Sequence, residues 1–597
     1  YMADLRSLSK ELVARALNEL IKEKNIEMTA IEGSSIAAET PPSPDMGDIG
    51  FPLFQYAKTF RMAPPVIAKE ILAKIESYPE TISAGSFFCA GPYLNVKLQK
   101  AAAAGAVLER VKSQGLTFGS YNAKNEQSLK GRRVMLEFSS PNTNKPLHLG
   151  HLRNDALGES VSRILKLLGA EVFKVNIINN RGVHICKSML AYQKFHQSTN
   201  DTPESLGLKS DRFVGDCYVE FNKYSKENSE AEAEAQNLLI EWEKGNPEVR
   251  ALWEKMNEWA FRGVKQTYDR TSVSFDKFYF ESDTYLKGKE EILSGLEKGL
   301  FYREDDGSVW VDLEEIKLDK KVLLRKDGTA LYMTQDIGTA IFRHNDWAFN
   351  QLVYVVGSEQ IYHFKVLFYI LKKLGYEWSD RLFHLSYGMV NLPEGKMKSR
   401  EGTVVDADDL IDSLRDGALE EIKEKGREEA VGDAKEVAEK VALGALHYFL
   451  LQVSPTKDMI FNPKESLSFN GNTGPYLQYM GARISSIVRK AESDGLADTD
   501  NKTDYSLLTH EAEWELIKQI ETFPSVLEKA GTDLDPSGVA VYAYELAKLF
   551  SRFYHDCPIL ASGSKELSLA RLELAKAVKT VLKTAMNVIL VPFLETM

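Results

Sequence analysis

The sequence predicts an α/β protein built on a doubly wound parallel sheet, with an α+β unit before the sheet and an all-α bundle after it. Short apolar runs at 134–138, 172–178 and 352–357 alternate with helical segments, which is the pattern of a parallel sheet covered by helices. The stretch before residue 115 mixes helical and strand patterns, whereas the sequence beyond 441 is almost entirely helical. Because one core rarely serves 597 residues, several domains are expected.

The N-terminal unit is predicted to span residues 1–118. Its first 27 residues are typical of an amphipathic helix, and two short strands at 87–89 and 93–98 flank a Gly-Pro turn. The stretch 115–131 is rich in Gly, Ser, Asn and Lys and lacks sustained periodicity, which favours a linker.

The sheet domain is predicted at 119–440 and the helical domain at 441–597. Between the strand at 172–178 and the strand at 352–357, a charged and mostly helical stretch covers about 192–323. We predict this stretch as an insertion into the sheet domain that contributes no strand to the sheet.

Composition and charge limit the class of protein. Apolar residues make up 44% of the chain and charged residues 27%, as in ordinary globular proteins, and no apolar run is long enough to span a bilayer. The four cysteines are scattered, which argues against a zinc site or a disulfide framework and favours the reducing cytoplasm. A net charge of −12 argues against nonspecific nucleic-acid binding, but a local basic track would still suffice for an RNA partner.

The most informative stretch is 139–151 (SSPNTNKPLHLGH), where an apolar strand gives way to a helix expected to begin at Leu152. Two histidines, His148 and His151, lie on either side of Gly150, and Lys145 precedes them. A helix N-terminus attracts anions, so imidazole and ammonium groups added there suit a phosphate under attack. The alternative is a strand–turn–helix with two surface histidines, since short motifs recur by chance.

A second motif, residues 395–402 (GKMKSREG), follows an apolar strand-like run at 382–390. It carries three cationic side chains between two glycines. Taken alone, it would be a solvated basic turn.

The two motifs together resemble those of the class I aminoacyl-tRNA synthetases. That class carries a HIGH-like sequence after the first strand and a KMSKS-like loop after the last strand of a Rossmann-type domain. Residues 148–151 (HLGH) match the first motif closely, and residues 396–400 (KMKSR) match the second in part.

Further segments sharpen the resemblance to arginyl-tRNA synthetase. The similar segments are 137–142 (EFSSPN), 330–338 (ALYMTQDIG), 355–360 (VVGSEQ) and, in the family's anticodon-binding domain, 471–479 (GNTGPYLQY). The N-terminal unit, with AGPYLN at 90–95, resembles the family's additional domain. An ordered set of this kind is far more specific than a lone motif.

The substrate implied by the resemblance is L-arginine, whose planar and always charged guanidinium suits a carboxylate fork. Asp336 is its expected main partner, with Glu137 and Tyr332 beside it. Asn142 and Gln360 are expected at the polar ends of the substrate.

Each of the acidic and aromatic candidates has a structural alternative. Asp336 could cap a helix beginning at Ile337, because it follows a strand-like run. Tyr332 could belong to the core, and Glu137 could pair with a neighbouring lysine or arginine.

The implied reaction has two steps: arginine and ATP give arginyl-adenylate and pyrophosphate, and a ribose hydroxyl of the tRNA then takes the arginyl group. Such transfer is accelerated by alignment and by positive groups where charge develops. His148 and His151 are expected to donate hydrogen bonds to the phosphates, and Gly150 to leave room for adenine. Mg²⁺ is expected with the triphosphate, held by phosphate oxygens and water, and no residue is assigned as a metal ligand.

The KMSKS-like loop departs from the class pattern, because Lys398 and Ser399 stand where Ser and Lys are usual. Many arginine enzymes lack the second lysine and keep one just upstream of the HIGH-like element, which here is Lys145. The resemblance therefore assigns Lys145 as the transition-state cation and Lys396 to the loop. Whether Lys398 or Arg400 reaches the pyrophosphate stays open. The expected ATP contacts are His148, Gly150, His151, Lys396, Met397 and Lys398.

RNA recognition is expected on a helix that carries Tyr476, Tyr479 and Arg483 at spacing three and then four, on one face. Aromatic planes and a guanidinium suit unstacked bases, although a tyrosine stripe is also common in a bundle core. The resemblance adds Tyr93 and Asn95 as contacts to the tRNA D-loop, and Met597 near the anticodon.

The implied partners are tRNA(Arg), L-arginine and ATP, with no membrane, and the chain is expected to be a monomer. The resemblance implies that activation of arginine requires tRNA, and the departure in the loop motivates the same prediction. Two other functions are considered. A tRNA-independent nucleotidyltransferase shares the His-x-Gly-His motif but is disfavoured by chain length and by the helical domain. An inactive binding paralogue is disfavoured because Lys145, His148, His151 and Asp336 are all present.

Overall fold

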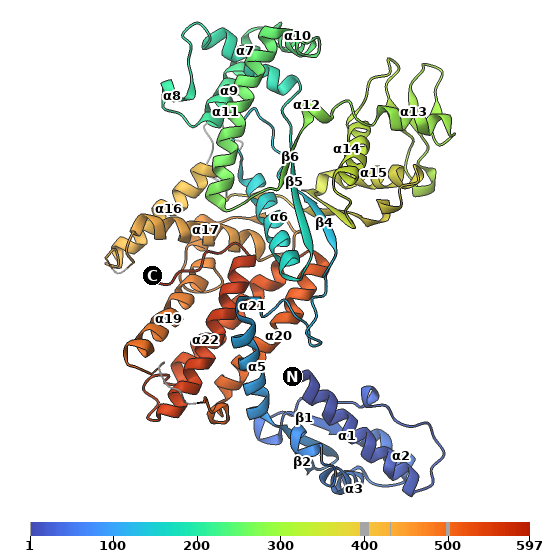
Figure 1. Cartoon of the computed structure of the whole chain (residues 1–597), viewed down its shortest axis with the longest axis vertical. Helices are drawn as coiled ribbons and strands as arrows, with labels where there is room; N and C mark the ends of the chain where they lie inside the picture. The colour runs from blue at the N-terminus through green and yellow to red at the C-terminus, as the bar shows by residue number, and fades with distance from the viewer. Residues whose placement is uncertain (1, 394–404, 430, 497–501) are drawn as a thin grey trace.

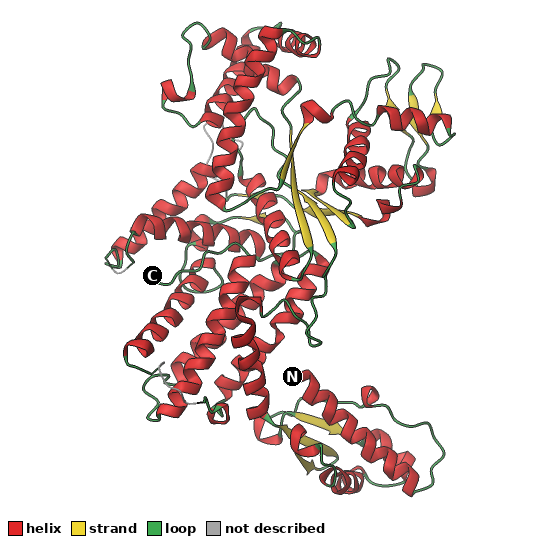
Figure 2. Cartoon of the chain, viewed as in Figure 1, coloured by secondary structure: helices red, strands yellow, loops and turns green. Residues whose placement is uncertain are grey.

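A computed structural model describes residues 2–393, 405–429, 431–496 and 502–597 (Figure 1). Figure 2 shows strands near the middle of the molecule, in the unit at the bottom and at the upper right, with helices elsewhere. No helix of these described ranges is long and apolar enough to cross a membrane.

The N-terminal unit is a small antiparallel sheet covered by helices, at the bottom of Figure 1. Its strands lie in the order β1-β3-β2, and the predicted Gly-Pro turn joins β2 to β3. Helices α1 and α3 bury their apolar faces against this unit. The bounds are α1 (Met2–Glu23), β1 (Ile49–Pro52), α3 (Pro64–Glu76), β2 (Gly85–Ala90) and β3 (Tyr93–Leu98).

Helix α5 (Lys100–Gln114) leaves this unit and packs along the C-terminal helices α20 (Glu511–Asp533) and α22 (Lys565–Val588). Its small buried side chains, such as Ala103 and Val107, allow this close approach. The boundaries at 118 and 440 stay predictions, but α5 joins the first unit to the last.

The central sheet has five parallel strands in the order β11-β10-β4-β5-β6. The chain enters the middle strand, runs to one edge and then returns to build the other side, which confirms the predicted doubly wound fold. The strands are β4 (Arg133–Glu137), β5 (Glu171–Ile178), β6 (Lys277–Phe280), β10 (Gln351–Gly357) and β11 (Leu382–Tyr387).

Both faces of the sheet are buried, because successive strand residues point to opposite sides. Val134 and Leu136 belong to the core shared with helix α6 (Leu149–Leu167), whereas Met135 belongs to a second core. The helices of this second core are α14 (Tyr332–Asp346) and α15 (Ile361–Lys373).

The stretch predicted as an insertion, 192–323, differs from that prediction in one respect: it contains β6, which pairs with β5 at the edge of the sheet. Before β6 stand α7 (Val183–Phe195) and three long helices, and after it comes a small antiparallel sheet, β7-β8-β9. Strand β6 is only four residues long and follows charged helices, so its pattern is weak. The helices are α9 (Ser210–Glu227), α10 (Ala231–Glu243) and α11 (Pro247–Thr271), and the strands are β7 (Tyr302–Arg303), β8 (Val309–Val311) and β9 (Lys321–Leu324).

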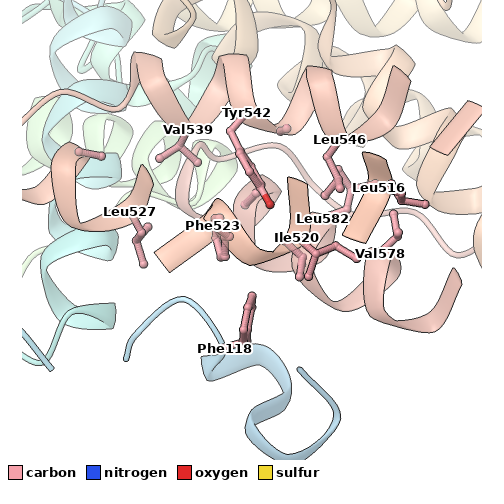
Figure 3. Close-up of a cluster of buried hydrophobic side chains, with 14 of the residues drawn as sticks. Phe118, Leu516, Ile520, Phe523, Leu527, Val539, Tyr542, Leu546, Val578 and Leu582 are labelled. Carbon is pink, nitrogen blue, oxygen red and sulfur yellow. The ribbon is translucent and has the colours of Figure 1, made fainter. Parts of the chain in front are cut away.

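The C-terminal part is a helical bundle, as predicted. Figure 3 shows its core, where Phe118 from the segment after α5 faces Phe523 of α20. The Phe523 ring lies 6.4 Å from that of Phe118 and 5.1 Å from that of Tyr542. The other long helices here are α16 (Ala407–Glu424), α17 (Ala434–Leu451), α19 (Gly474–Ser493) and α21 (Ser537–Asp556).

Candidate active site

The predicted ATP- and arginine-binding residues that follow β4 and β10 in sequence lie where these two strands end. These adjacent strands lie at the point where the order of the sheet reverses, with their carboxyl ends on one edge. In doubly wound sheets the crevice at this point is the usual ligand site. Helix α6 starts here after β4, and α15 starts here after β10.

The turn after β4 is held in an unfavourable backbone conformation. Ser139 has φ of 77° and Ser140 has φ of 51°, in the left-handed region that L-residues rarely occupy. Buried amides compensate: the Ser139 N–H donates to Asn154 Oδ1 at 2.6 Å, and the Ser140 N–H donates to Asn176 Oδ1 at 2.9 Å. Such imposed strain is typical of functional turns.

The two histidines cap helix α6, which begins at Leu149 rather than at the predicted Leu152. The Gly150 N–H donates to His148 Nδ1 at 3.0 Å, and the His148 N–H donates to His151 Nδ1 at 3.1 Å. Because each Nδ1 accepts a hydrogen bond, the proton of each neutral ring is on Nε2. The ring centroids are 4.0 Å apart, so the pair presents two fixed N–H donors.

Both histidines are uncharged at neutral pH. Burial lowers the pKa of His148 to about 4, and the charge of Lys145 acts in the same direction. Burial, His148 and Lys145 hold the pKa of His151 well below its usual value. Gly150 is required by this arrangement, since a Cβ there would lie 2.8 Å from His148 Cε1.

Lys145 is exposed on the loop between β4 and α6. The loop is fixed on both sides of Asn142: the Asn179 N–H donates to Pro141 O at 2.9 Å, and the Thr143 N–H donates to Asn179 O at 3.2 Å. Asn142 itself is exposed at the sheet edge, as a ligand contact requires.

Two described residues that follow the second motif in sequence, Val405 and Ala407, are hydrogen-bonded to the histidine segment. The Leu149 N–H donates to Val405 O at 3.1 Å, and the Ala407 N–H donates to Leu147 O at 2.9 Å. The start of α16 is therefore paired with the backbone on either side of His148. Three predicted ATP contacts lie outside the described residues: Lys396, Met397 and Lys398.

The predicted arginine-binding residues Tyr332 and Asp336 lie in the first turns of α14. Since the helix begins at Tyr332, Asp336 does not cap a helix starting at Ile337. The Tyr332 side chain is 74% exposed and is no part of the core. Asp336 Oδ2 lies 2.5 Å from Nε2 of His363, a residue of α15, which brings the carboxylate to the same sheet edge.

Glu137, at the end of β4, is buried and already paired. Arg343 Nη1 donates to its Oε2 at 2.6 Å, and the Ser140 hydroxyl donates to its Oε1 at 3.3 Å. The alternative named from sequence, an ion pair with a neighbouring cation, is therefore present. Gln360 is exposed between β10 and α15.

One acidic residue of this edge, Glu281, was missed from the sequence. It follows β6 directly, and burial raises its pKa to about 7, with Asp336 adding to the rise and Arg181 opposing it. Glu281 opens the short helix α12 (Glu281–Thr284), which contacts α14, the helix that carries Asp336. The position of Glu281 directly after a strand could have marked it as a site residue. The stretch 192–323 was predicted to contribute no strand to the sheet, so this position was not recognised.

The predicted RNA-binding side chains of α19 converge on one cavity of about 380 Å³. Tyr476, Tyr479, Arg483 and the terminal Met597 all line it, although Met597 is remote in sequence. Arg483 Nη2 donates to the Tyr479 hydroxyl at 2.6 Å. Further lining residues include Lys425, Arg427, Phe469 and Asn470.

The two candidates of the N-terminal unit differ in exposure. Tyr93 is half-buried, with its ring 5.7 Å from that of the exposed Phe54. Asn95 is only 2% exposed, and its Nδ2 donates to Met46 O at 2.8 Å. Asn95 thus stabilises the unit from within.

Three protein-family models match successive parts of the chain. The model of the catalytic domain of class I tRNA synthetases (R) matches residues 117–463. The chain belongs to the arginyl-tRNA synthetase family. The family's N-terminal domain model matches residues 8–98 of this synthetase, and the DALR anticodon-binding domain model matches 477–597.

Among curated relatives of the synthetase, the arginine–tRNA ligase of Treponema denticola is 62% identical over the full length of both chains. That of Treponema pallidum is 56% identical, again over both full lengths. The solved arginyl-tRNA synthetase of Thermus thermophilus has the same fold, with a TM-score of 0.71 at 24% identity over 98% of this chain and 99% of that one.

Proposed function

We propose that the chain activates L-arginine with ATP and transfers it to tRNA(Arg), the activity of the family to which it belongs. The observation that carries this proposal is the pairing of two opposite sites on one sheet edge. Fixed neutral N–H donors at the start of α6 suit phosphates, and carboxylates on α14 and after β6 suit a guanidinium.

In the first step, the carboxylate of arginine attacks the α-phosphate of ATP and pyrophosphate leaves. The Nε2–H groups of His148 and His151 donate to the phosphate oxygens on which charge grows, helped by the positive end of α6. Because both rings are fixed before ATP binds, no reorganisation is needed in the transition state. Lys145 supplies a positive charge beside them, and we assign Lys396, Met397 and Lys398 to the same ATP.

Arginine recognition follows from charge. Asp336 receives the guanidinium with Glu281 opposite, and the exposed ring of Tyr332 covers it. Glu137 is buried at the end of β4 and paired with Arg343, so it supports the site and is not a free carboxylate for the substrate. Asn142 and Gln360 contact the amino and carboxyl groups of the substrate.

In the second step, a terminal ribose hydroxyl of the tRNA attacks the arginyl carbonyl of the adenylate, an ester forms and AMP leaves. The cavity of α19 is open to an unstacked base, and it combines Tyr476, Tyr479, Arg483 and Met597 in the manner of base-stacking sites. Tyr93 offers a ring on the N-terminal unit. Asn95 supports the strand that carries Tyr93.

Mg²⁺ would enter with the triphosphate, whose oxygens it prefers as ligands. The part of the chain that the structure describes holds no group of three His, Cys, Asp or Glu side chains able to bind a metal ion. We assign the ion no protein ligand.

We place the enzyme in the cytoplasm as a monomer. All four cysteines are free thiols in the structure, which suits a reducing compartment. Gel filtration with light scattering would test the oligomeric state.

The deciding experiment is arginine-dependent exchange of pyrophosphate into ATP, with and without tRNA(Arg). We expect exchange with arginine and none with citrulline, which is similar in shape but uncharged. We also expect exchange only when tRNA is present. No exchange under either condition, from folded protein, would overturn the proposal and favour an inactive binding paralogue.

A further inference from the structure

Arg270, near the end of α11, joins three helices of different parts of the chain. Its Nε donates to Glu439 Oε1 of α17 at 2.7 Å, and its Nη2 donates to Asp412 Oδ1 of α16 at 2.7 Å. Its Nη1 donates to Asp408 Oδ1 at 3.2 Å, in the first turn of α16. The guanidinium is 20% exposed, so these charge-assisted bonds are partly shielded from water.

One side of this junction leads to residues 139–151, between the end of β4 and the first turn of α6, which we call the histidine turn. Asp408 also accepts hydrogen bonds from Lys209 Nζ at 2.7 Å and from the Thr267 hydroxyl at 2.9 Å, so the start of α16 is held firmly. The residues just before it pair with the backbone around His148, through the Leu149–Val405 hydrogen bond. A shift of α16 would therefore move the caps of α6.

The other side leads to the cavity of α19. Gln478, fully buried between Tyr476 and Tyr479, donates from Nε2 to the carbonyl of Lys440 at 2.9 Å. Lys440 is the residue after Glu439. The two helices are also in close backbone contact, since a Cβ on Gly474 would lie 2.1 Å from Gly444 O. Helices α17 and α19 are thus joined by a buried hydrogen bond and by close backbone packing.

We propose that Arg270 is a positioning residue that couples the RNA-binding cavity of α19 to the histidine turn. Its hydrogen bond to Glu439 ties it to α17, which packs against α19. Its hydrogen bond to Asp408 fixes the start of α16, and with it the backbone around His148. RNA seated in the cavity then stabilises the arrangement in which the histidines meet ATP. The inference rests on the proposed function, and it gives a physical route by which tRNA promotes activation of arginine.

A purely structural role makes a different prediction. If Arg270 only fastened the insertion to the bundle, its loss would lower thermal stability and leave the response to tRNA unchanged. A coupling residue leaves each site intact and changes the free energy that links them, typically a factor of about 5 to 150 in such systems. The two roles are therefore separated by kcat, KM and tRNA affinity measured together.

The test is Arg270→Gln, with Arg212→Gln as matched control. Arg212 also bridges the insertion to the first turn of α16, through both oxygens of Asp409, but this pair is exposed and lacks contact with α17. In pyrophosphate exchange with saturating tRNA, we expect Arg270→Gln to lower kcat by about tenfold or more. The KM for arginine and the Kd for tRNA should stay within about twofold, and Arg212→Gln should match the wild type.

Two further variants guard against misfolding. Glu439→Gln removes the charge that Arg270 meets on α17, together with a longer ion pair to Arg415 of α16 at 4.0 Å, and should lower kcat in the presence of tRNA in the same way. Combined with Arg270→Gln it should add little, because both act in one network. Arg270→Lys, which cannot reach all three acids, should fall between the wild type and Arg270→Gln.

The outcomes separate the two proposals. A wild-type enzyme without exchange would overturn the proposed function itself. An active wild type, with Arg270→Gln and Glu439→Gln both retaining full kcat with tRNA, would overturn the coupling. A loss of tRNA affinity in place of kcat would also overturn it, since Arg270 would then belong to RNA binding.

Discussion

The two halves of the candidate site differ in how their polar groups are held. At the histidine turn, both Nδ1 atoms and the N–H groups of Ser139 and Ser140 have hydrogen-bond partners within the chain. In the proposed arginine pocket, the Asp336 side chain is 41% exposed and has His363 as its partner. Glu281 there has a pKa raised to about 7.

This difference matches the two tasks. Phosphate chemistry needs donors already in place when charge develops, so rigidity and a fixed protonation state lower the barrier. Recognition of a guanidinium needs negative charge only when the substrate is bound. One carboxyl can therefore stay protonated until the cation arrives and favours its ionised form. The histidine turn should thus govern kcat, and the acidic pocket should govern the KM for arginine.

The largest expected effect is that of Asp336→Asn. The amide keeps the shape of the side chain but removes the charge opposite the guanidinium, so kcat/KM for arginine should fall by about a thousandfold, on the order of 4 kcal/mol. The KM for ATP should change little. Asp380→Asn, in an exposed ion pair with Lys372, is the control and should behave as the wild type. An equal rise in both KM values would break the division between the two halves.

Substitution of His148 separates its two roles. His148→Ala removes both the cap of α6 and the Nε2–H donor, so kcat should fall about a hundredfold or more and stability by about 1 kcal/mol. His148→Asn can still accept from the Gly150 N–H, because asparagine is a good N-cap, and should restore stability without restoring kcat. Thermal unfolding and single-turnover rates measure the two effects. Recovery of kcat in the asparagine variant would show that the cap, and not the donor, drives the chemistry.

Glu281→Gln should raise the KM for arginine by about tenfold at pH 8. In the wild type, Glu281 is protonated below its pKa of about 7 and ionised above it, so the affinity for arginine should increase as pH rises from 6 to 8. The variant has no carboxyl to ionise, and its KM should respond less to pH. Arginine binding by calorimetry in buffers of different ionisation enthalpy would detect the released proton. A wild-type KM that is flat over this range would place Glu281 outside the pocket.

The sequence predicted the fold class because its strongest signals are local. Apolar runs such as 172–178 and 352–357 correspond closely to β5 and β10, and the α+β and all-α units stand on either side of the sheet. Strand β6 escaped prediction because four aromatic and basic residues between charged helices carry no clear period. Because β6 was not predicted, Glu281 was not predicted as a site residue either, since only its position at the end of that strand identifies it.

The site shows the same limit of local patterns. The sequence placed the start of α6 at Leu152, because histidine is an unusual N-cap and its ring hydrogen bonds are tertiary detail. It named the two alternatives for Asp336 and Glu137, but only the structure decides between them. Asp336 does not cap its helix, whereas Glu137 pairs with Arg343, a residue 206 positions away.

The smallest expected effect is that of pH on the histidine turn. Because the pKa of His148 is about 4 in the fold, the ring stays neutral from pH 6 to 9, and kcat at saturating arginine should show no ionisation near 6.5. Stability should respond instead. The folded pKa lies below the unfolded value, so the stabilisation is complete above pH 6.5 and is lost as pH falls towards 4. The melting temperature of the wild type should therefore fall more steeply with acid than that of His148→Asn. An inflection of kcat near pH 6.5 that His148→Asn removes would mean that the ring titrates during catalysis, and the contrast with Glu281 would then disappear.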